Sequence, residues 1–242
     1  MLSEERKPGD EIDEICFRYE RRRLLRDLRY SRIAPDVVMR FQEKERAIIK
    51  CFIKAGLPPL DNKRVLEIGC GSGDNLLNFI SLGFQPKNLT GIDLLAERIR
   101  QARIRLPGAL ELIQGDASEY PFEPSSYDIV FQSTVFTSIL NDQFRQKLAR
   151  QMWGSVRSGG GILWYDFMYN NPRNRDVRGI SFREISRLFP YGQISRIRIT
   201  LAPPLARLVA RVSPKLYSWC NSIPLLRTHW LCWIQKGKDS SR

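Results

Sequence analysis

Apolar positions follow one spacing over the first 56 residues and another over the rest of the chain. Over residues 10–56 they recur every three or four positions with charges between them, and this spacing predicts helices. From residue 63 onward, short apolar runs alternate with amphipathic stretches that are long enough for helices. The runs that predict strands are 65–68, 89–92, 110–114, 129–132, 161–166, 194–201 and 230–235. The stretches that predict helices between them are 75–82, 95–105 and 142–156.

Strands that alternate with helices predict an α/β fold, with a mainly parallel sheet and helices on both faces. We divide the chain into an N-terminal helical cap, residues 1–56, and a main domain, residues 57–242. An insertion at about 203–228 separates the last two predicted strands. Its apolar residues recur at helical spacing, with Arg207 and Arg211 on the other side. Such a segment either covers a pocket as a lid or lies in a membrane interface.

Composition places the chain among ordinary globular proteins. Of its 242 residues, 43% are hydrophobic and 27% are charged. Five cysteines and one histidine form no CxxC or Cys/His cluster, so we expect neither a disulfide framework nor a metal site. The N-terminus lacks the apolar core of a signal peptide, and no run of about eighteen apolar residues occurs. We therefore expect a cytoplasmic protein, either free or peripheral at the inner membrane surface.

Basic residues are concentrated toward the C-terminus. The formal net charge is +13, and residues 151–242 hold 15 Lys and Arg against 4 Asp and Glu. A one-sided positive field raises the local concentration of anionic partners. The charge therefore allows phosphorylated small molecules, nucleic acid and anionic lipid surfaces as partners.

A glycine-rich loop follows the first predicted strand. The strand continues into Gly69, Gly71 and Gly73, and a predicted helix comes next. Glycines allow a tight turn and let backbone N–H groups approach a ligand, while the helix N-terminus favours negative charge. The spacing is GxGxG, because Asp74 stands where a dinucleotide-binding loop keeps its third glycine. The loop therefore differs from that of the nicotinamide-dependent enzymes.

Acidic residues end the next two strands. Asp93 follows the second strand, where a carboxylate is placed to accept hydrogen bonds from both ribose hydroxyls of an adenosine. Asp116 follows the third strand, where it could accept from an adenine amino group. Together with the glycine loop, these residues resemble the class I S-adenosylmethionine-dependent methyltransferases, over roughly residues 62–167.

That resemblance implies a Rossmann-like, doubly wound sheet with an antiparallel last strand, and an enzyme that transfers a methyl group from S-adenosylmethionine. Glu67 would neighbour the ammonium end of the cofactor, Asp93 its ribose and Asp116 its adenine. The residues implied to contact the cofactor are Glu67, Gly69, Gly71, Gly73, Asp93, Leu94, Asp116, Ala117 and Gln132.

The substrate is expected at the carboxyl ends of the strands, where ligands gather in an open parallel sheet. A long polar loop, 168–180, follows the fifth strand on that side, and such loops are more often functional than not. It resembles a loop of methyltransferases encoded among bacterial genes for cell-surface polysaccharides and related natural products. The residues that we expect to contact the substrate are Tyr165, Asn170, Asn171, Arg175 and Arg178.

A hydroxyl acceptor needs a base that takes its proton during the transfer. The candidate catalytic residues are Asp166, at the end of the fifth strand, and His229, just before the last strand. Each has an alternative role, Asp166 as the anchor of its loop and His229 as a hydrogen-bonded structural residue.

The function that we favour from the sequence is O-methylation of a phosphorylated or lipid-diphosphate-linked sugar, or of a related anionic small molecule. One alternative is methylation of a quinone-like or polyketide lipid at a membrane surface. Another, from a different class, is a basic module that binds RNA. The chain has no Asn-Pro-Pro-Tyr motif, with which enzymes position nucleobase nitrogens, and its aromatic residues form no stacking series. We therefore expect no nucleic-acid partner.

Overall fold

The computed structural model describes residues 11–24, 33–171, 174 and 176–237. Its centre is a seven-stranded sheet in the order β3-β2-β1-β4-β5-β7-β6. The strands are β1 (Val65–Ile68), β2 (Leu89–Asp93), β3 (Glu111–Gln114), β4 (Tyr127–Ser133), β5 (Val156–Phe167), β6 (Gln193–Leu201) and β7 (Arg227–Gln235). Neighbours from β3 to β5 are parallel, and β7 is antiparallel to both β5 and β6. The predicted fold class, a mainly parallel sheet with an antiparallel last strand, is confirmed.

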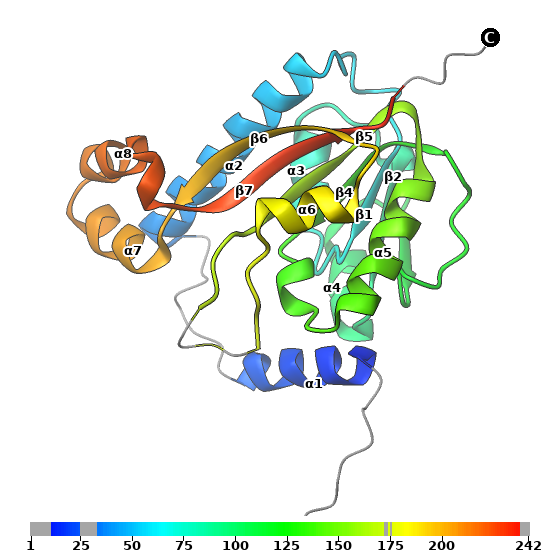
Figure 1. The fold of residues 1–242 in the computed structure, drawn as a ribbon, viewed down its shortest axis with the longest axis horizontal. Helices are drawn as coiled ribbons and strands as arrows, with labels where there is room; N and C mark the ends of the chain where they lie inside the picture. The colour runs from blue at the N-terminus through cyan, green and yellow to red at the C-terminus, as the bar shows by residue number, and fades with distance from the viewer. Residues whose placement is uncertain (1–10, 25–32, 172–173, 175, 238–242) are drawn as a thin grey trace, which may run out of the picture.

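Helices cover both faces of this sheet (Figure 1). They are α1 (Glu11–Leu24), α2 (Pro35–Lys54), α3 (Asp74–Ser81), α4 (Ala96–Arg105), α5 (Asp142–Ser155), α6 (Phe182–Leu188), α7 (Pro203–Val212) and α8 (Pro214–Ser222). Short 3₁₀ helices are η2 (Pro86–Asn88), η3 (Phe136–Ser138) and η4 (Pro224–Leu226). Pro35 begins α2, since proline fits the first turn of a helix, where its missing N–H group has no partner to lose.

Alternate residues of the central strands face opposite sides of the sheet, because successive side chains of a strand point in opposite directions. In β4, Val130 packs into a core with α5 and α6, whereas Ile129 and Phe131 pack into a second core with α2, α3 and α4. The same alternation in β5 sends Trp164 to the first core and Tyr165 to the second. The central strands are thus buried on both faces, which explains their nearly continuous apolar runs.

The predicted insertion forms a small lobe of α7, α8 and η4, residues 203–226. Figure 1 shows the lobe beyond the end of β6, at the left of the sheet. Its own core includes Val209 and Tyr217, and Met39 of α2 packs against that core. The lobe is therefore attached to the rest of the molecule through α2 and the last strands.

Three segments differ from the predicted elements. β7 begins at Arg227 and not at residue 230, so His229 lies inside the last strand and not just before it. β5 begins at Val156 and not at residue 161, because its first residues bulge against β4 before the regular pairing of Ile129 with Gly161. The sequence pattern does not predict α6, whose seven residues are too few to show a helical period. Ser181 sets its start, since the Ser181 side chain accepts a hydrogen bond from the Glu184 backbone.

Candidate active site

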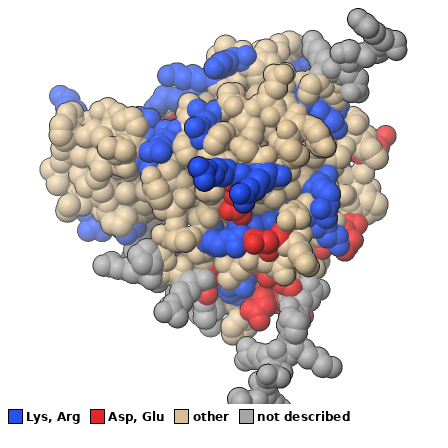
Figure 2. Space-filling view, viewed as in Figure 1, with Lys and Arg blue, Asp and Glu red and all other residues tan. Residues whose placement is uncertain are grey.

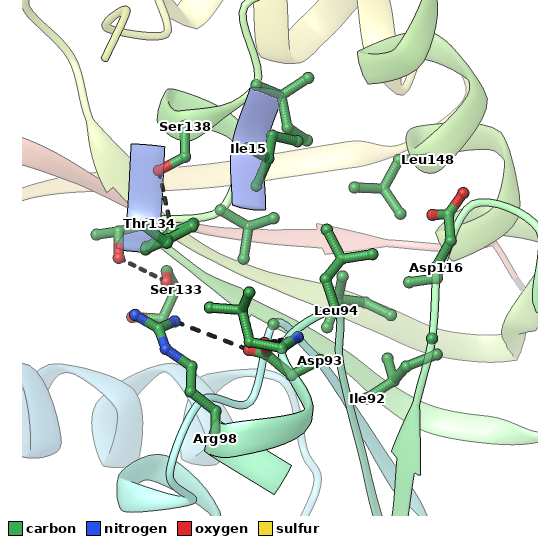
Figure 3. Close-up of a pocket in the computed structure, with 18 of the residues that line it drawn as sticks. Ile15, Ile92, Asp93, Leu94, Arg98, Asp116, Ser133, Thr134, Ser138 and Leu148 are labelled. Atoms are coloured by element: carbon green, nitrogen blue, oxygen red, sulfur yellow. Dashed lines mark hydrogen bonds and ion pairs between the residues drawn. The ribbon is translucent and has the colours of Figure 1, made fainter. Parts of the chain in front are cut away.

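A cavity of about 200 Å³ lies at the carboxyl ends of β1 to β4, and α1 covers it. In Figure 3, Ile15 points from α1 toward the cavity, while Asp93, at the end of β2, and Asp116, just beyond β3, lie along its wall. The expected cofactor residues that line this cavity are Gly69, Asp93, Leu94, Asp116 and Ala117. The cavity therefore lies at the edge of the sheet where the sequence predicts the cofactor site.

The loop between β1 and α3 depends on its glycines. Gly69, Gly71 and Gly73 have φ angles of +67°, +57° and +85°, which L side chains rarely adopt. A Cβ atom on Gly69 would lie 2.5 Å from Cγ2 of Val135, another residue of the cavity wall. The loop thus presents bare backbone at the point where a ligand would approach.

Asp93 is held in the cavity wall and is only 6% exposed. The backbone N–H groups of Gly71 and Leu95 each donate to one of its carboxylate oxygens, both at 2.9 Å. Nη1 of Arg98 lies 3.9 Å from Oδ2 (Figure 3). An ionised carboxylate offers about four lone-pair sites, so these contacts orient Asp93 and leave room for ribose hydroxyls.

Asp116 lies two residues beyond the end of β3. Its carboxylate accepts hydrogen bonds from the backbone and the hydroxyl of Ser118, both at 2.8 Å. These bonds fix the turn after β3, which places Ala117 in the wall of the cavity. Because β2 and β3 are neighbours, one ligand can contact Asp93 and Asp116 together.

Glu67 lies behind the glycine loop and is fully buried in β1. Nδ2 of Asn75 donates to its Oε1 at 2.6 Å, and Nζ of Lys44, from α2, donates to Oδ1 of Asn75 at 2.7 Å. Oε2 of Glu67 has no hydrogen-bond partner within the described parts of the chain. Burial raises the pKa of Glu67 to about 8. A buried acceptor without a donor is costly, so this oxygen fits the ammonium end of S-adenosylmethionine.

Comparisons with known proteins agree with this geometry. A solved S-adenosylmethionine-dependent methyltransferase from Methanosarcina mazei superimposes with a TM-score of 0.56 at 19% identity, over 74% of this chain and 94% of that one. Phosphoethanolamine N-methyltransferase 2 from Haemonchus contortus, solved with S-adenosylmethionine, gives 0.61 at 20% identity, over 81% of this chain and 52% of that one. These likenesses show the fold. Residues 65–160, which include the glycine loop, Asp93 and Asp116, match the family model of a methyltransferase domain. Residues 65–160 are therefore similar to a methyltransferase domain, on a fold that solved S-adenosylmethionine-dependent methyltransferases share.

Curated relatives share part of this methyltransferase domain. Phthiotriol/phenolphthiotriol dimycocerosates methyltransferase 1 of Mycobacterium ulcerans is 34% identical over 132 residues, 52% of this chain and 47% of that protein. Fatty-acid O-methyltransferase of Mycolicibacterium smegmatis is 37% identical over 111 residues, 44% of this chain and 38% of that protein. The chain spans about half or less of the length of these relatives. They give no support to the expected resemblance with proteins of polysaccharide gene clusters.

The other expected cofactor residues do not line the cavity. Glu67, Gly71 and Gly73 lie behind or beside its wall. Gln132 is fully buried, and its Oε1 accepts from the Val135 backbone at 3.1 Å. Gln132 therefore holds the turn after β4, and its direct contact with the cofactor stays a prediction.

The expected substrate residues that the structure describes also lie outside the cavity. Tyr165 is buried in the second core, and its hydroxyl is 2.9 Å from Oγ1 of Thr200. Oδ1 of Asn170 accepts from the Gly179 backbone at 2.9 Å, which closes the loop 168–180 across its base. These side chains are occupied by contacts within the protein, so their roles in substrate binding stay predictions.

Two arginines of the same loop were expected to face the substrate, together with Asn171. Arg178 pairs with Asp142 and with Glu184. Asn171 is exposed, and its carbonyl accepts from the Asn174 backbone at 3.0 Å. Arg175 lies outside the described residues. The contacts of Arg178 attach the loop to α5 and α6, and neither Arg178 nor Asn171 lines the cavity.

Asp166 is fully buried at the end of β5. It accepts hydrogen bonds from the Thr137 hydroxyl at 2.7 Å, the Thr137 backbone at 3.2 Å and the Phe167 backbone at 2.9 Å. Burial raises its pKa to about 6. These contacts anchor η3, whose Ser138 lines the cavity, and they favour the structural role over the catalytic one.

His229, the other candidate base, is enclosed in β7 and only 2% exposed. Its ring stacks on Tyr165, with centroids 4.8 Å apart, and its Nδ1 lies 3.1 Å from Oγ1 of Thr228. Burial lowers the pKa of His229 to about 3, and the positive charges of Arg40 and Lys44 act in the same direction. The imidazole is therefore neutral near physiological pH, but it is a weak proton acceptor.

The sequence predicts a helical cap that helps to cover the pocket, but it does not reveal which residues of α1 reach the site. Oε1 of Glu11 accepts from the Leu140 backbone at 2.8 Å, and Arg18 donates to the Ser138 carbonyl at 3.1 Å. The hydroxyl groups of Tyr19 and Ser138 lie 3.1 Å apart. These bonds hold α1 across the cavity. The only signal in the sequence is an apolar spacing that includes Ile15, and it does not say what that face covers.

Proposed function

We propose that the protein transfers the methyl group of S-adenosylmethionine to an oxygen atom of a lipid. The observation that carries methyl transfer is the combination, around one cavity, of the glycine loop, Asp93 and the unpartnered oxygen of Glu67. These three features suit the methionine, ribose and ammonium parts of the cofactor. In this proposal, residues 1–56 cap the domain that residues 57–242 form.

A lipid acceptor is supported by the names of the curated relatives. One acts on phthiotriol and phenolphthiotriol dimycocerosates and another on fatty acids. The phosphorylated sugar that we favour from the sequence gains no support from them, whereas the alternative of a polyketide-like lipid partly fits. The excess of basic residues after residue 150 still favours an acceptor that carries negative charge.

A carboxylate is the acceptor oxygen that suits this site best. A hydroxyl must lose its proton as it attacks, whereas a carboxylate is already ionised near neutral pH. Among the residues that line the described cavity, the carboxylates are Asp93 and Asp116, which we assign to the ribose and the adenine. His229 and Asp166 are both enclosed by other side chains. An acceptor that needs no base therefore fits the described residues better than an alcohol.

The residues of this chain would then act by binding and positioning. When bound, the cofactor supplies a methyl group on a sulfonium, a strong electrophile. The glycine loop and Asp93 hold its two ends, and Ile15 and Tyr19 of α1 exclude water from above. Correct alignment of donor and acceptor can account for several kcal/mol of a displacement barrier. The acceptor oxygen forms the new bond to carbon, and the bond from carbon to sulfur breaks.

Replacing Asp93 with alanine should weaken S-adenosylmethionine binding roughly tenfold or more, because charge-assisted hydrogen bonds to the ribose contribute about 1.5–3 kcal/mol each. Calorimetric titration of the folded variant measures the effect. The matched control is Asp61→Ala, which removes an exposed carboxylate that does not line the cavity. This variant should bind S-adenosylmethionine as the natural protein does. Unchanged affinity in a folded Asp93→Ala protein would exclude the ribose assignment.

Cofactor affinity should increase as the pH rises toward about 8, the value to which burial raises the pKa of Glu67. Below that pH the carboxyl group is protonated in the free protein, and binding of an ammonium group must displace the proton. Above it, the carboxylate is already ionised, so the increase levels off. Titrations across this range should show the slope in the natural protein and not in Glu67→Gln. The same slope in both proteins would assign it to another group.

A further inference from the structure

The lobe formed by residues 203–226 exposes more apolar surface than its own core can cover. On α7, Val209 is buried, but Leu208 and Val212 are 66% and 71% exposed. The single apolar stripe that the sequence predicts is therefore divided between the core and the solvent. Trp219 of α8 is 66% exposed, and Leu225 of η4 is 79% exposed. All of these side chains belong to one small, contiguous segment of the fold.

Positive charges accompany this apolar surface. Arg207, Arg211 and Lys215 lie on α7 and α8, and residues 203–228 contain no Asp or Glu. Figure 2 shows the lobe at the left as mostly tan surface with blue side chains at its margins and no red. Apolar side chains with Lys and Arg beside them match the interface of an anionic bilayer, where apolar groups insert and cations remain at the headgroups.

We propose that the lobe docks the protein on an anionic lipid bilayer. No helix in the described part of the chain has the length and apolar composition needed to cross a membrane. α7 and α8, with ten and nine residues, would lie in the interface plane. Trp219 suits that plane because an indole combines an apolar ring with a hydrogen-bond donor. Leu208, Val212 and Leu225 would enter the acyl region, and the basic side chains would pair with phosphate groups.

The position of the lobe connects this surface with the site. β6 and β5 are both antiparallel to β7, so β6 ends at the same edge of the sheet as the strands around the cavity. The lobe begins at Pro203, two residues beyond the end of β6 at Leu201, and Met39 of α2 packs against its core. A lipid leaving the bilayer here would reach the edge of the sheet where the strands end. This last step rests on the proposed lipid acceptor, whereas docking itself does not.

Co-sedimentation with vesicles tests the docking surface without cofactor or acceptor. The full-length protein should bind vesicles of phosphatidylcholine with phosphatidylglycerol, and bind phosphatidylcholine alone far more weakly. Leu208→Ser combined with Trp219→Ser should reduce binding to the anionic vesicles by at least roughly tenfold, because inserted apolar area sets the affinity. Arg211→Glu combined with Lys215→Glu should do the same, because each basic residue near an anionic surface contributes to binding. Tryptophan fluorescence should shift to the blue on vesicle binding, and Trp219→Phe should remove most of the shift.

Matched controls lie near β2 and β3, on the opposite side of the sheet from β6 and the lobe. Ile104→Ser on α4 removes an aliphatic side chain that is 82% exposed. Lys87→Glu with Arg100→Glu reverses two exposed cations, and both control proteins should bind vesicles normally. Equal losses in control and lobe variants, or no binding to anionic vesicles, would overturn the proposal. So would a dimer in sedimentation velocity that Trp219→Ser dissociates, because the lobe would then cover a second copy. Failure here would leave the cofactor titrations untouched, so it is distinguishable from failure of the proposed function.

Discussion

Alanine at Gly69 should lower the affinity for S-adenosylmethionine by roughly 10²-fold, since misplacement by about 1 Å can cost that much at a site. The added Cβ would lie 2.5 Å from Cγ2 of Val135, so either the backbone of the glycine loop or the side chain of Val135 must move. Valine is branched at Cβ and has little freedom to rotate away. Either the glycine loop withdraws its backbone from the ligand, or Val135 moves into the cavity that it lines.

Gly56 supplies a matched control for the backbone strain. Its φ of +66° is almost that of Gly69, +67°, but a Cβ there would meet nothing within 4 Å. Both alanine variants should therefore lose about 1–2 kcal/mol of stability from the left-handed backbone. Only Gly69→Ala should lose cofactor binding, as measured by calorimetry at a temperature where both are folded. Val135→Ala in the same chain should recover part of that loss, and a double-mutant cycle measures the coupling. Equal affinities in the two glycine variants would mean that the close approach is irrelevant.

The parts of the fold and site that the sequence predicts are those set by local pattern. Strands such as β1 and β4 are nearly continuous apolar runs because helices cover both of their faces. The glycine loop and Asp93 can be recognised in the sequence, because the glycines of a tight turn and the acidic residue at the end of the next strand occur at a fixed spacing. Each of these patterns involves only a few residues that are close in the sequence. They can therefore be identified without knowledge of the tertiary contacts.

The parts that the sequence does not predict depend on contacts between distant segments. Ile15 is visible as an apolar position of a helix, but the bond between Tyr19 and Ser138 that brings α1 over the cavity joins residues far apart in the chain. In the sequence, Lys44 is one of several charged residues of α2, but in the structure it is buried and donates a hydrogen bond to Asn75. Hydrophobic period says which face of a helix is covered and not what covers it.

The chemistry of His229 illustrates the same limit. From the sequence it is a histidine just before the last strand, with an ordinary pKa near 6.5 and a plausible role as base. In the sheet, it stands opposite Phe167 on one side and Ile199 on the other. That enclosure lowers its pKa to about 3. If His229 took a proton during catalysis, the rate would already be level with pH well below neutrality, because the neutral imidazole predominates above its pKa.

A long-chain fatty acid should therefore be methylated at least roughly 10²-fold faster than the alcohol of the same chain length, because positioned general bases contribute about 10²–10⁴-fold and the acid needs none. Incubation of the purified protein with S-adenosylmethionine carrying a labelled methyl group, and extraction of the lipid product, measures both rates. The two acceptors share their alkyl chain and differ in the charge of the head group, so the turnover rates are compared at saturating concentrations of each acceptor. His229→Gln and Asp166→Asn should lower the turnover of the acid by no more than a few-fold in protein that remains folded, although Asp166→Asn should also lower the melting temperature by disturbing its bonds to Thr137.

The opposite result would restore the hypothesis drawn from the sequence. If the alcohol is the better acceptor and His229→Gln reduces its turnover by about 10²–10⁴-fold, His229 is the base and must leave its enclosure between Tyr165 and Phe167 during the reaction. If Asp166→Asn alone has that effect, the role belongs to Asp166. A loss of turnover together with unchanged cofactor affinity separates either outcome from damage to the cavity, because the proposed cofactor residues, Asp93 and the glycine loop, form hydrogen bonds with neither His229 nor Asp166.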